Sequence, residues 1–176
     1  MSETDWKIEL FPYGEIWAER IDFSIGGHDF LMVFTPMSEI SDEDTLAQKS
    51  EDVGFNIPEN SYDVKFDRAE NFESGDFYAP SSSKINLKQL NRLGLIIKQI
   101  IEFHYSLKNT EVYFAGAENL RLARYYDRLV RTYAGQLQFE VVARLGEEGL
   151  DYAIRTPKYK NKRKKDRRHE EDQRGL

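Results

Sequence analysis

The chain has 176 residues, of which 40% are hydrophobic and 13% aromatic, and it contains no cysteine. This composition favours one globular domain and excludes disulfide bonds, thiolate metal sites and cysteine nucleophiles. No apolar run approaches the roughly 20 residues that a bilayer span requires, and the first ten residues lack the pattern of a signal peptide. We therefore expect a cytoplasmic protein that has no membrane partner.

Charge is distributed unevenly along the chain. Residues 1–80 contain 19 acidic and 5 basic residues, residues 81–157 contain 8 and 11, and residues 158–176 contain 4 and 9. The formal net charge of the whole chain is −6. A uniformly nucleic-acid-binding surface is excluded, because the acidic N-terminal half would repel a phosphate backbone.

The N-terminal part of the chain has the alternating pattern of an antiparallel sheet. Residues 6–11 alternate apolar and polar side chains and predict a strand, which Pro12 should end. Residues 16–25 and 30–34 flank the dipeptide Gly26-Gly27, which can adopt the positive φ angles of a tight turn. These segments predict a hairpin.

The following segments are less regular. The apolar phase slips between Ala18 and Ile21, which indicates a bulge or a twist in the first arm of the hairpin and not a regular ladder. Farther on, Ser41 is placed to cap one or two helical turns. Residues 62–66 alternate apolar and polar side chains and predict a strand, whereas residues 70–83 contain glycine, proline and serines and predict a loop.

The strongest pattern lies between Ile85 and Ala134, where we predict a helix, a short strand and a second helix. Asn86 is a good N-cap, and Gln89 is spaced to complete a capping box. Apolar residues then recur at helical spacing, and we expect Ile97 and Ile100 to be buried.

Local signals divide the rest of this segment. Asn109 suits a left-handed end of the first helix, and residues 111–115 have the β-branched and aromatic content of a strand. Asn119 can cap the second helix, which Gly135 should end.

The C-terminal part predicts a second hairpin and a tail. Residues 137–144 and 150–155 flank a glycine-bounded turn. We therefore predict an α/β (α+β) fold with a mixed, largely antiparallel sheet and two main helices, formed by residues 1–157. Residues 158–176 are basic and too polar to bury a core, so we expect a disordered tail.

Two features resemble the C-terminal half of the GNAT N-acetyltransferases. One is the order of helix, strand, helix and hairpin. The other is the sequence NLRLARYYDRL at residues 119–129, because in that family an Asn follows a strand and a Tyr lies seven residues later on a helix. Residues 139–142 resemble the start of the next strand. The resemblance implies a GNAT-like topology, with Asn119 near the pantetheine arm of coenzyme A and Tyr126 as the general acid for the departing thiolate.

The segment before the first main helix departs from the family pattern. GNAT enzymes hold the coenzyme A pyrophosphate with an Arg/Gln-x-x-Gly-x-Gly/Ala loop, whose backbone N–H groups open a helix. Residues 79–86 read APSSSKIN here, without glycine, and Pro80 has no N–H to donate. The remaining cofactor-binding candidates in this segment are Ser82 and Ser83. Their hydroxyl and N–H groups would lie close to the helix start.

The second main helix carries a set of basic residues on one side. Their spacings of three and four predict a solvated polar face or a surface for an anion or an acidic partner. The set consists of Arg121, Arg124, Arg128 and Arg131.

The three histidines, His28, His104 and His169, are not spaced as a helical metal site, so no metal is expected. His104 lies on the apolar stripe of the first main helix and is interpreted as a core histidine.

These sequence features are compatible with three functions. The first is a non-catalytic or degenerate GNAT-like binding or interaction protein, with a protein partner and no cofactor; an accessory protein of a phage or mobile element would fit it. The alternative is an acyl-CoA-dependent N-acetyltransferase with a divergent cofactor loop, which would use acetyl-CoA and Tyr126. The third is a protein that binds nucleic acid weakly, without sequence preference, through the basic residues between Lys158 and Arg168.

Overall fold

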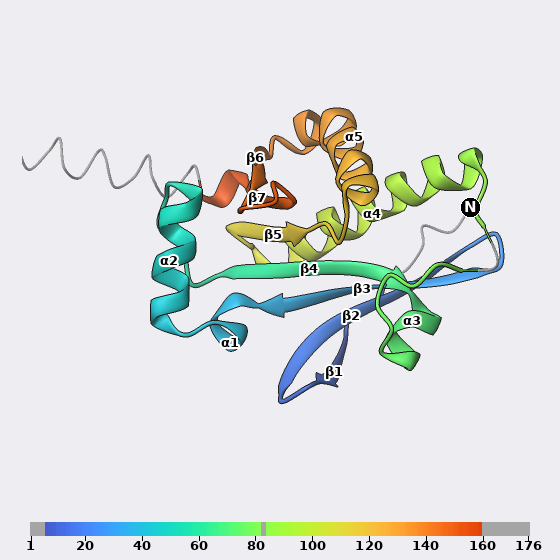
Figure 1. The fold of residues 1–176 in the computed structure, drawn as a ribbon, viewed down its shortest axis with the longest axis horizontal. Coiled ribbons are helices and arrows are strands. Elements are labelled where there is room, and N and C mark those ends of the chain that lie inside the picture. The colour runs from blue at the N-terminus through green and yellow to red at the C-terminus, as the bar shows by residue number, and fades with distance from the viewer. Residues whose placement is uncertain (1–5, 82–83, 160–176) are drawn as a thin grey trace, which may run out of the picture.

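The computed structural model describes residues 6–81 and 84–159. Its strands are β1 (Glu9–Tyr13), β2 (Ile16–Ile25), β3 (His28–Pro36), β4 (Ser61–Arg68), β5 (Val112–Gly116), β6 (Glu140–Leu145) and β7 (Asp151–Arg155). Its helices are α1 (Met37–Ile40), α2 (Glu43–Val53), α3 (Ala69–Ser74), α4 (Leu87–Lys108) and α5 (Leu120–Leu137). The strands form one sheet in the order β1-β2-β3-β4-β5-β7-β6 (Figure 1). Because only β4 and β5 run parallel, the predicted α/β class and largely antiparallel sheet are confirmed.

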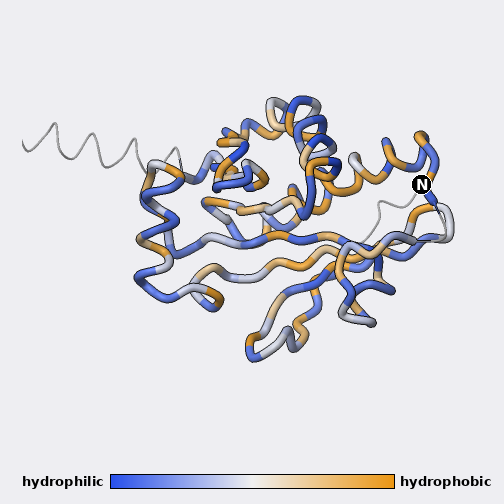
Figure 2. Tube along the Cα trace, viewed as in Figure 1, coloured by the Kyte–Doolittle hydropathy of each residue, from blue (hydrophilic) through white to orange (hydrophobic). Residues whose placement is uncertain are grey.

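Helices pack on both faces of the sheet. Beneath α4 and α5 lies the main core, in which Ile97 and Ile100 are buried as predicted, together with aromatic and aliphatic side chains of β2, β3 and β4. On the opposite face, α3 packs on β2 and β3, and the end of α2 packs on β5 and β7. Figure 2 shows hydrophobic stretches along the central strands and α4, whereas α2 is mostly hydrophilic.

The edge strand β1 begins three residues later and ends two residues later than predicted. It includes Pro12, which pairs with Trp17 instead of ending the strand. Proline is tolerated here because β1 has no strand on its outer side and needs no N–H donor there. The predicted hairpin between β2 and β3 is confirmed, with Gly26 and Gly27 at φ 54° and 81°.

The predicted bulge in β2 is wrong. This strand pairs with β1 and β3 in unbroken register. Ala18 faces Leu31 and Val33 on the α3 side, whereas Ile21 belongs to the core under α4. Because both faces of the strand are covered, apolar residues occur in both phases, and the change of phase needs no extra residue.

Two helices differ from the sequence predictions. The N-cap of α2 is Asp42, not Ser41, and its side chain accepts a hydrogen bond from the N–H of Thr45. The helix has 11 residues and ends at Gly54, whose φ is 79°. Within the segment predicted as a loop, α3 forms a six-residue helix that ends at Gly75. A helix this short shows no clear apolar period in the sequence.

The predicted helix, strand and helix are confirmed as α4, β5 and α5. Asn86 Oδ1 accepts from the N–H of Gln89 at 2.8 Å, and the Gln89 side chain accepts from the N–H of Asn86 at 2.9 Å. Asn109 ends α4 in the left-handed conformation. The end of α5 was predicted too early, because Gly135 is helical and Gln138 is the left-handed cap.

The C-terminal hairpin is shorter than predicted, and its register is irregular between Val142 and Leu145 of β6. After β7 the chain forms a helical turn in which Tyr159 is buried beside Phe55. Residues 160–176, which include most of the expected tail, lie outside the described residues. Within the described part of the chain, no helix combines the length and apolarity needed to cross a bilayer.

Candidate functional site at the opening between β4 and β5

The two parallel strands pair over only three residues each. Residues 61–63 of β4 pair with residues 112–114 of β5, whereas β3 follows β4 as far as Arg68. Beyond this short ladder, β5 continues to pair with β7. Across the described parts of the chain, no strand pairs with β4 on this side from Val64 to Arg68. An opening in the middle of the sheet results.

Tyr126 of α5 lies at this opening. Its side chain is 9% exposed, and its ring centroid lies 6.0 Å from that of Phe66 on β4 and 5.7 Å from that of Tyr152 on β7. Its hydroxyl forms no hydrogen bond with any described residue, and it is not among the fully buried unpartnered atoms of the described chain. Tyr126 therefore offers a hydroxyl group that a ligand can bind.

The electrostatic surroundings keep Tyr126 protonated. Burial raises the pKa of its hydroxyl well above the usual value, and Tyr78, Asp63 and Asp67 raise this pKa further. A tyrosine in this state is neutral at physiological pH. It can donate a hydrogen bond or a proton, but it is not a nucleophile.

A buried carboxylate orders the segment beside Tyr126. Asp67 accepts hydrogen bonds from the N–H of Arg68 at 2.7 Å, the Asn71 amide at 2.8 Å and the N–H of Tyr78 at 2.5 Å. Tyr78 is held at a φ of 60°, which is uncommon for residues other than glycine. Such strain is more frequent at functional sites than elsewhere.

Asp63 is the last residue of β4 that pairs with β5, and it is the second carboxylate whose charge raises the pKa of Tyr126. Burial raises the pKa of Asp63, although the charges of Lys65 and Lys49 oppose this effect. The charges of Asp63 and Asp67 therefore act on a neutral tyrosine hydroxyl. This hydroxyl can exchange a hydrogen bond with an amide or amine.

The predicted cofactor-binding residues are occupied or outside the described chain. Asn119 is exposed, and its Oδ1 accepts a hydrogen bond from the N–H of Leu122 as the N-cap of α5. Ser82 and Ser83 lie outside the described residues.

The first turn of α4 faces the hairpin between β2 and β3. A Cβ atom built on Gly26 would lie 2.3 Å from Nε2 of Gln89, so the glycine turn and this side chain are in close contact. The Gln89 side chain is therefore held between the hairpin turn and its own capping box. This arrangement limits the space at the helix start where a phosphate would sit.

All four arginines predicted as an anion or partner surface are exposed on α5: Arg121, Arg124, Arg128 and Arg131. The guanidinium of Arg128 lies 5.4 Å from the ring centroid of Tyr125. A solvated face with one cation–π contact accounts for their positions.

A second group of titratable side chains lies under α4. His104 is fully buried, its ring stacks on Phe34, and its Nδ1 lies 2.8 Å from the hydroxyl of Tyr113. Its Nε2 lies 3.4 Å from Oε2 of Glu19, without hydrogen-bond geometry. Lys108 Nζ lies 3.5 Å from the same oxygen. Since a carboxylate only accepts, the tautomer with the proton on Nε2 suits both contacts.

Burial and charge shift the pKa values in this group. Burial lowers the pKa of His104, although Glu19 opposes the effect. Burial raises the pKa of Glu19, but His104 and Lys108 together lower it by more. Burial and the charge of Glu19 raise the pKa of Tyr62 to about 12. A neutral imidazole and a charged carboxylate are therefore favoured in the folded state.

Sequence reasoning missed the residues that surround Tyr126. Asp63 and Asp67 were placed on the wet face of their strand by alternation, but Asn71 of α3 and the N–H of Tyr78 in the next loop cover Asp67. Tyr78 fell in a predicted loop. The positive φ of Tyr78 leaves no trace in the sequence, so only the spatial arrangement reveals this group.

Neither a metal site nor a similar protein assigns a further role to these residues. The residues that the structure describes contain no cluster of histidine, aspartate and glutamate suited to a metal ion. No family model matches the chain, and no curated protein or solved structure shows significant similarity to it.

Proposed function

We propose that this chain is a GNAT-like binding protein of the cytoplasm, which engages a protein partner and does not use coenzyme A. The observation that carries the proposal is the internal bonding at the start of α4. Asn86 and Gln89 occupy each other's N–H groups at the position where GNAT enzymes present amides to a pyrophosphate. The sheet order and the parallel pair of β4 and β5 support the resemblance to that family.

Displacing the capping box would be costly for a phosphate ligand. The ligand would have to replace two well-formed hydrogen bonds and move a side chain that touches the Gly26 turn. Loss of an N-cap alone costs about 0.5 to 2 kcal/mol. The free energy that a phosphate would gain by binding at the helix N-terminus is reduced by this amount.

The unpaired edge of β4 supports a peptide as the partner. Between Val64 and Arg68 the backbone faces the opening without a strand partner among the described residues. An extended peptide can add main-chain hydrogen bonds to such an edge, and pockets for its side chains then give specificity. The ring of Tyr126 lies 6.0 Å from that of Phe66 in this segment, so its side chain is beside the unpaired edge.

The first test is a calorimetric titration of the full-length protein with acetyl-CoA. We expect no saturable heat at micromolar ligand concentrations. Micromolar binding would contradict the proposal. Binding that tightens in an Asn86→Ala variant, in which the capping box no longer competes for the N–H of Gln89, would place the pyrophosphate at the start of α4.

The second test looks for the partner directly. Peptides selected by display on the intact protein should protect backbone amides of residues 64–68 from hydrogen exchange. Selected peptides that protect only the exposed face of α5 would move the binding site to its arginines and refute the choice of β4.

One observation favours the acyltransferase alternative. The protonated Tyr126 hydroxyl has no hydrogen-bond partner among the described residues, as a general acid for a departing thiolate would require. If acetyl-CoA binds and an amine is acetylated, Tyr126→Phe should reduce turnover and leave ligand binding unchanged. A variant with full turnover would remove Tyr126 from the chemistry.

A further inference from the structure

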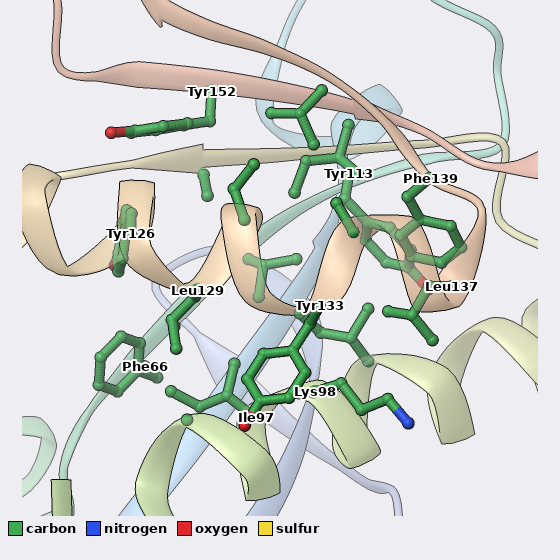
Figure 3. Close-up of a pocket in the computed structure, with 18 of the residues that line it drawn as sticks. Phe66, Ile97, Lys98, Tyr113, Tyr126, Leu129, Tyr133, Leu137, Phe139 and Tyr152 are labelled. Carbon is green, nitrogen blue, oxygen red and sulfur yellow. The ribbon is translucent and has the colours of Figure 1, made fainter. Parts of the chain in front are cut away.

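A cavity of about 110 Å³ lies between the sheet and the two long helices. Its sheet wall comes from β3, β4, β5, β6 and β7, and its helix wall comes from the facing sides of α4 and α5 (Figure 3). Ile97, Leu129 and Phe139 point into this space from three different segments. The cavity thus lies on the helix side of the sheet, and residues of the main core form part of its wall.

The geometry of the helix crossing keeps this space open. The two helices are in close contact at Gly94, where an added Cβ would lie 2.6 Å from a methyl group of Leu129. Farther along, the facing positions are Lys98 and Ile101 on α4 and Tyr133 and Leu137 on α5, all of them half-buried. The cavity is therefore nearest to solvent between these four side chains.

The chemistry of the wall is almost uniformly apolar. Lys98 is the only charged residue among the described residues that line the cavity, and its Nζ lies 2.9 Å from Oε2 of Glu102, a residue outside the lining. Figure 3 shows the nitrogen of Lys98 turned away from the other lining side chains. A charged ligand would lose its hydration there without gaining an oppositely charged partner that is free of another ion pair.

From this volume and lining we propose that the cavity is a binding site for a small uncharged apolar molecule or group, up to the size of benzene. An engineered protein cavity of about 150 Å³ with a similar aliphatic and aromatic lining stays dry and binds benzene. This proposal does not rest on the function proposed above, because it requires neither coenzyme A nor a peptide at β4.

Benzene is the probe for the main test. The full-length protein, labelled at isoleucine, leucine and valine methyl groups, is titrated with benzene and followed by NMR. Saturable shifts should appear for Ile97, Leu129 and Val141, which line the cavity. Leu31 and Val33, on the opposite face of the sheet, serve as internal controls and should not shift. Absence of saturable shifts, or equal shifts at both faces, would overturn the proposal.

A substitution that fills part of the cavity tests the location of the site independently of the chemical shifts. Ala134→Leu adds volume to the cavity wall, and Gln136→Leu adds a leucine to the same helix at an exposed position that does not line the cavity. We expect Ala134→Leu to weaken benzene binding by about tenfold or more and Gln136→Leu to leave it unchanged. Ala115→Leu, on the sheet wall, replaces Ala134→Leu if that variant does not fold. Undiminished binding in a folded filling variant would refute the site.

Charged analogues test the chemical class. Benzoate and benzylamine have the same ring as benzene but carry opposite charges, and both should bind far more weakly. Benzoate binding that exceeds benzene binding and disappears in Lys98→Gln would overturn the proposal, because the site would then select an anion.

Discussion

Two buried tyrosines, one on β5 beneath α4 and one on α5, differ in their hydrogen-bond partners. Tyr113, beneath α4, shares its hydroxyl with His104, whereas Tyr126, on α5, has a hydroxyl without a hydrogen bond to any described residue. Burial raises the pKa of both hydroxyls. The difference teaches that a perturbed pKa alone does not identify a binding group. A hydroxyl within a buried network stabilises the fold, and one without a partner is available to a ligand.

The largest expected effect comes from the core that both regions share. Ile100 is fully buried under α4, so Ile100→Ala should lower the free energy of unfolding by about 2 to 5 kcal/mol. Urea denaturation measures this change. Leu95→Ala, at an exposed position on the same helix, is the matched control and should cost well under half as much. Equal effects of the two substitutions would contradict the assigned core face of α4.

The next effect separates the two tyrosines directly. Tyr113→Phe leaves Nδ1 of His104 buried without a donor and should lower the free energy of unfolding by about 1 to 3 kcal/mol. Tyr126→Phe removes a hydroxyl that bonds to no described residue, and it should change stability by no more than about 0.5 kcal/mol. Denaturation of both variants under one set of conditions gives the comparison. A larger loss for Tyr126→Phe would mean that its hydroxyl has a structural partner.

The network under α4 should also make stability depend on pH. The folded-state pKa values of His104 and Glu19 are both lowered from their usual values of 6.5 and 4.5. The unfolded chain therefore binds these protons at higher pH than the folded chain does. Stability should be complete above pH 6.5 and should fall on acidification, by at most about 1.4 kcal/mol per pH unit for each proton.

Thermal unfolding between about pH 8 and pH 4 measures this dependence. In His104→Gln, the loss that begins near pH 6.5 should disappear, and the loss near the pKa of Glu19 should shrink, because His104 is the main group that lowers this pKa. An unchanged profile in this variant would assign the acid sensitivity to other groups.

The smallest expected effect concerns the exposed face of α5. Arg128→Ala removes the cation–π contact with Tyr125 and should cost about 0.5 to 1 kcal/mol. Arg124→Ala, at another exposed position of this helix, is the control and should be close to neutral. A larger loss for Arg124→Ala would indicate a structural contact of that guanidinium.

Features set by neighbouring residues were predictable from the sequence. The capping box at Asn86, the left-handed end at Asn109 and the glycine turn between β2 and β3 each depend on a few adjacent side chains. The apolar stripe of α4 identified Ile97 and Ile100 as buried because the helical period is long and uninterrupted. These local signals were sufficient to predict the order of α4, β5 and α5 along the chain.

Features that depend on distant segments were not predictable. Asp67 looked solvent-exposed by alternation and is buried, because a short unpredicted helix and the N–H of Tyr78 cover it. Glu19 and His104 belong to elements far apart in the sequence, and no local pattern joins them. Tyr126 was a candidate because of a family resemblance, but the residues around it could be identified only from the folded structure.

The outer edges of the sheet have a consequence for assembly. At one edge Pro12 removes an N–H from β1, and at the other the register of β6 breaks between Val142 and Leu145. Proline and irregular register are both devices that prevent strands of separate molecules from joining edge to edge. Ribbon-like stacking of copies through these two strands is therefore disfavoured, and concentrated solutions of the folded protein should resist fibril formation even though it contains long apolar strands.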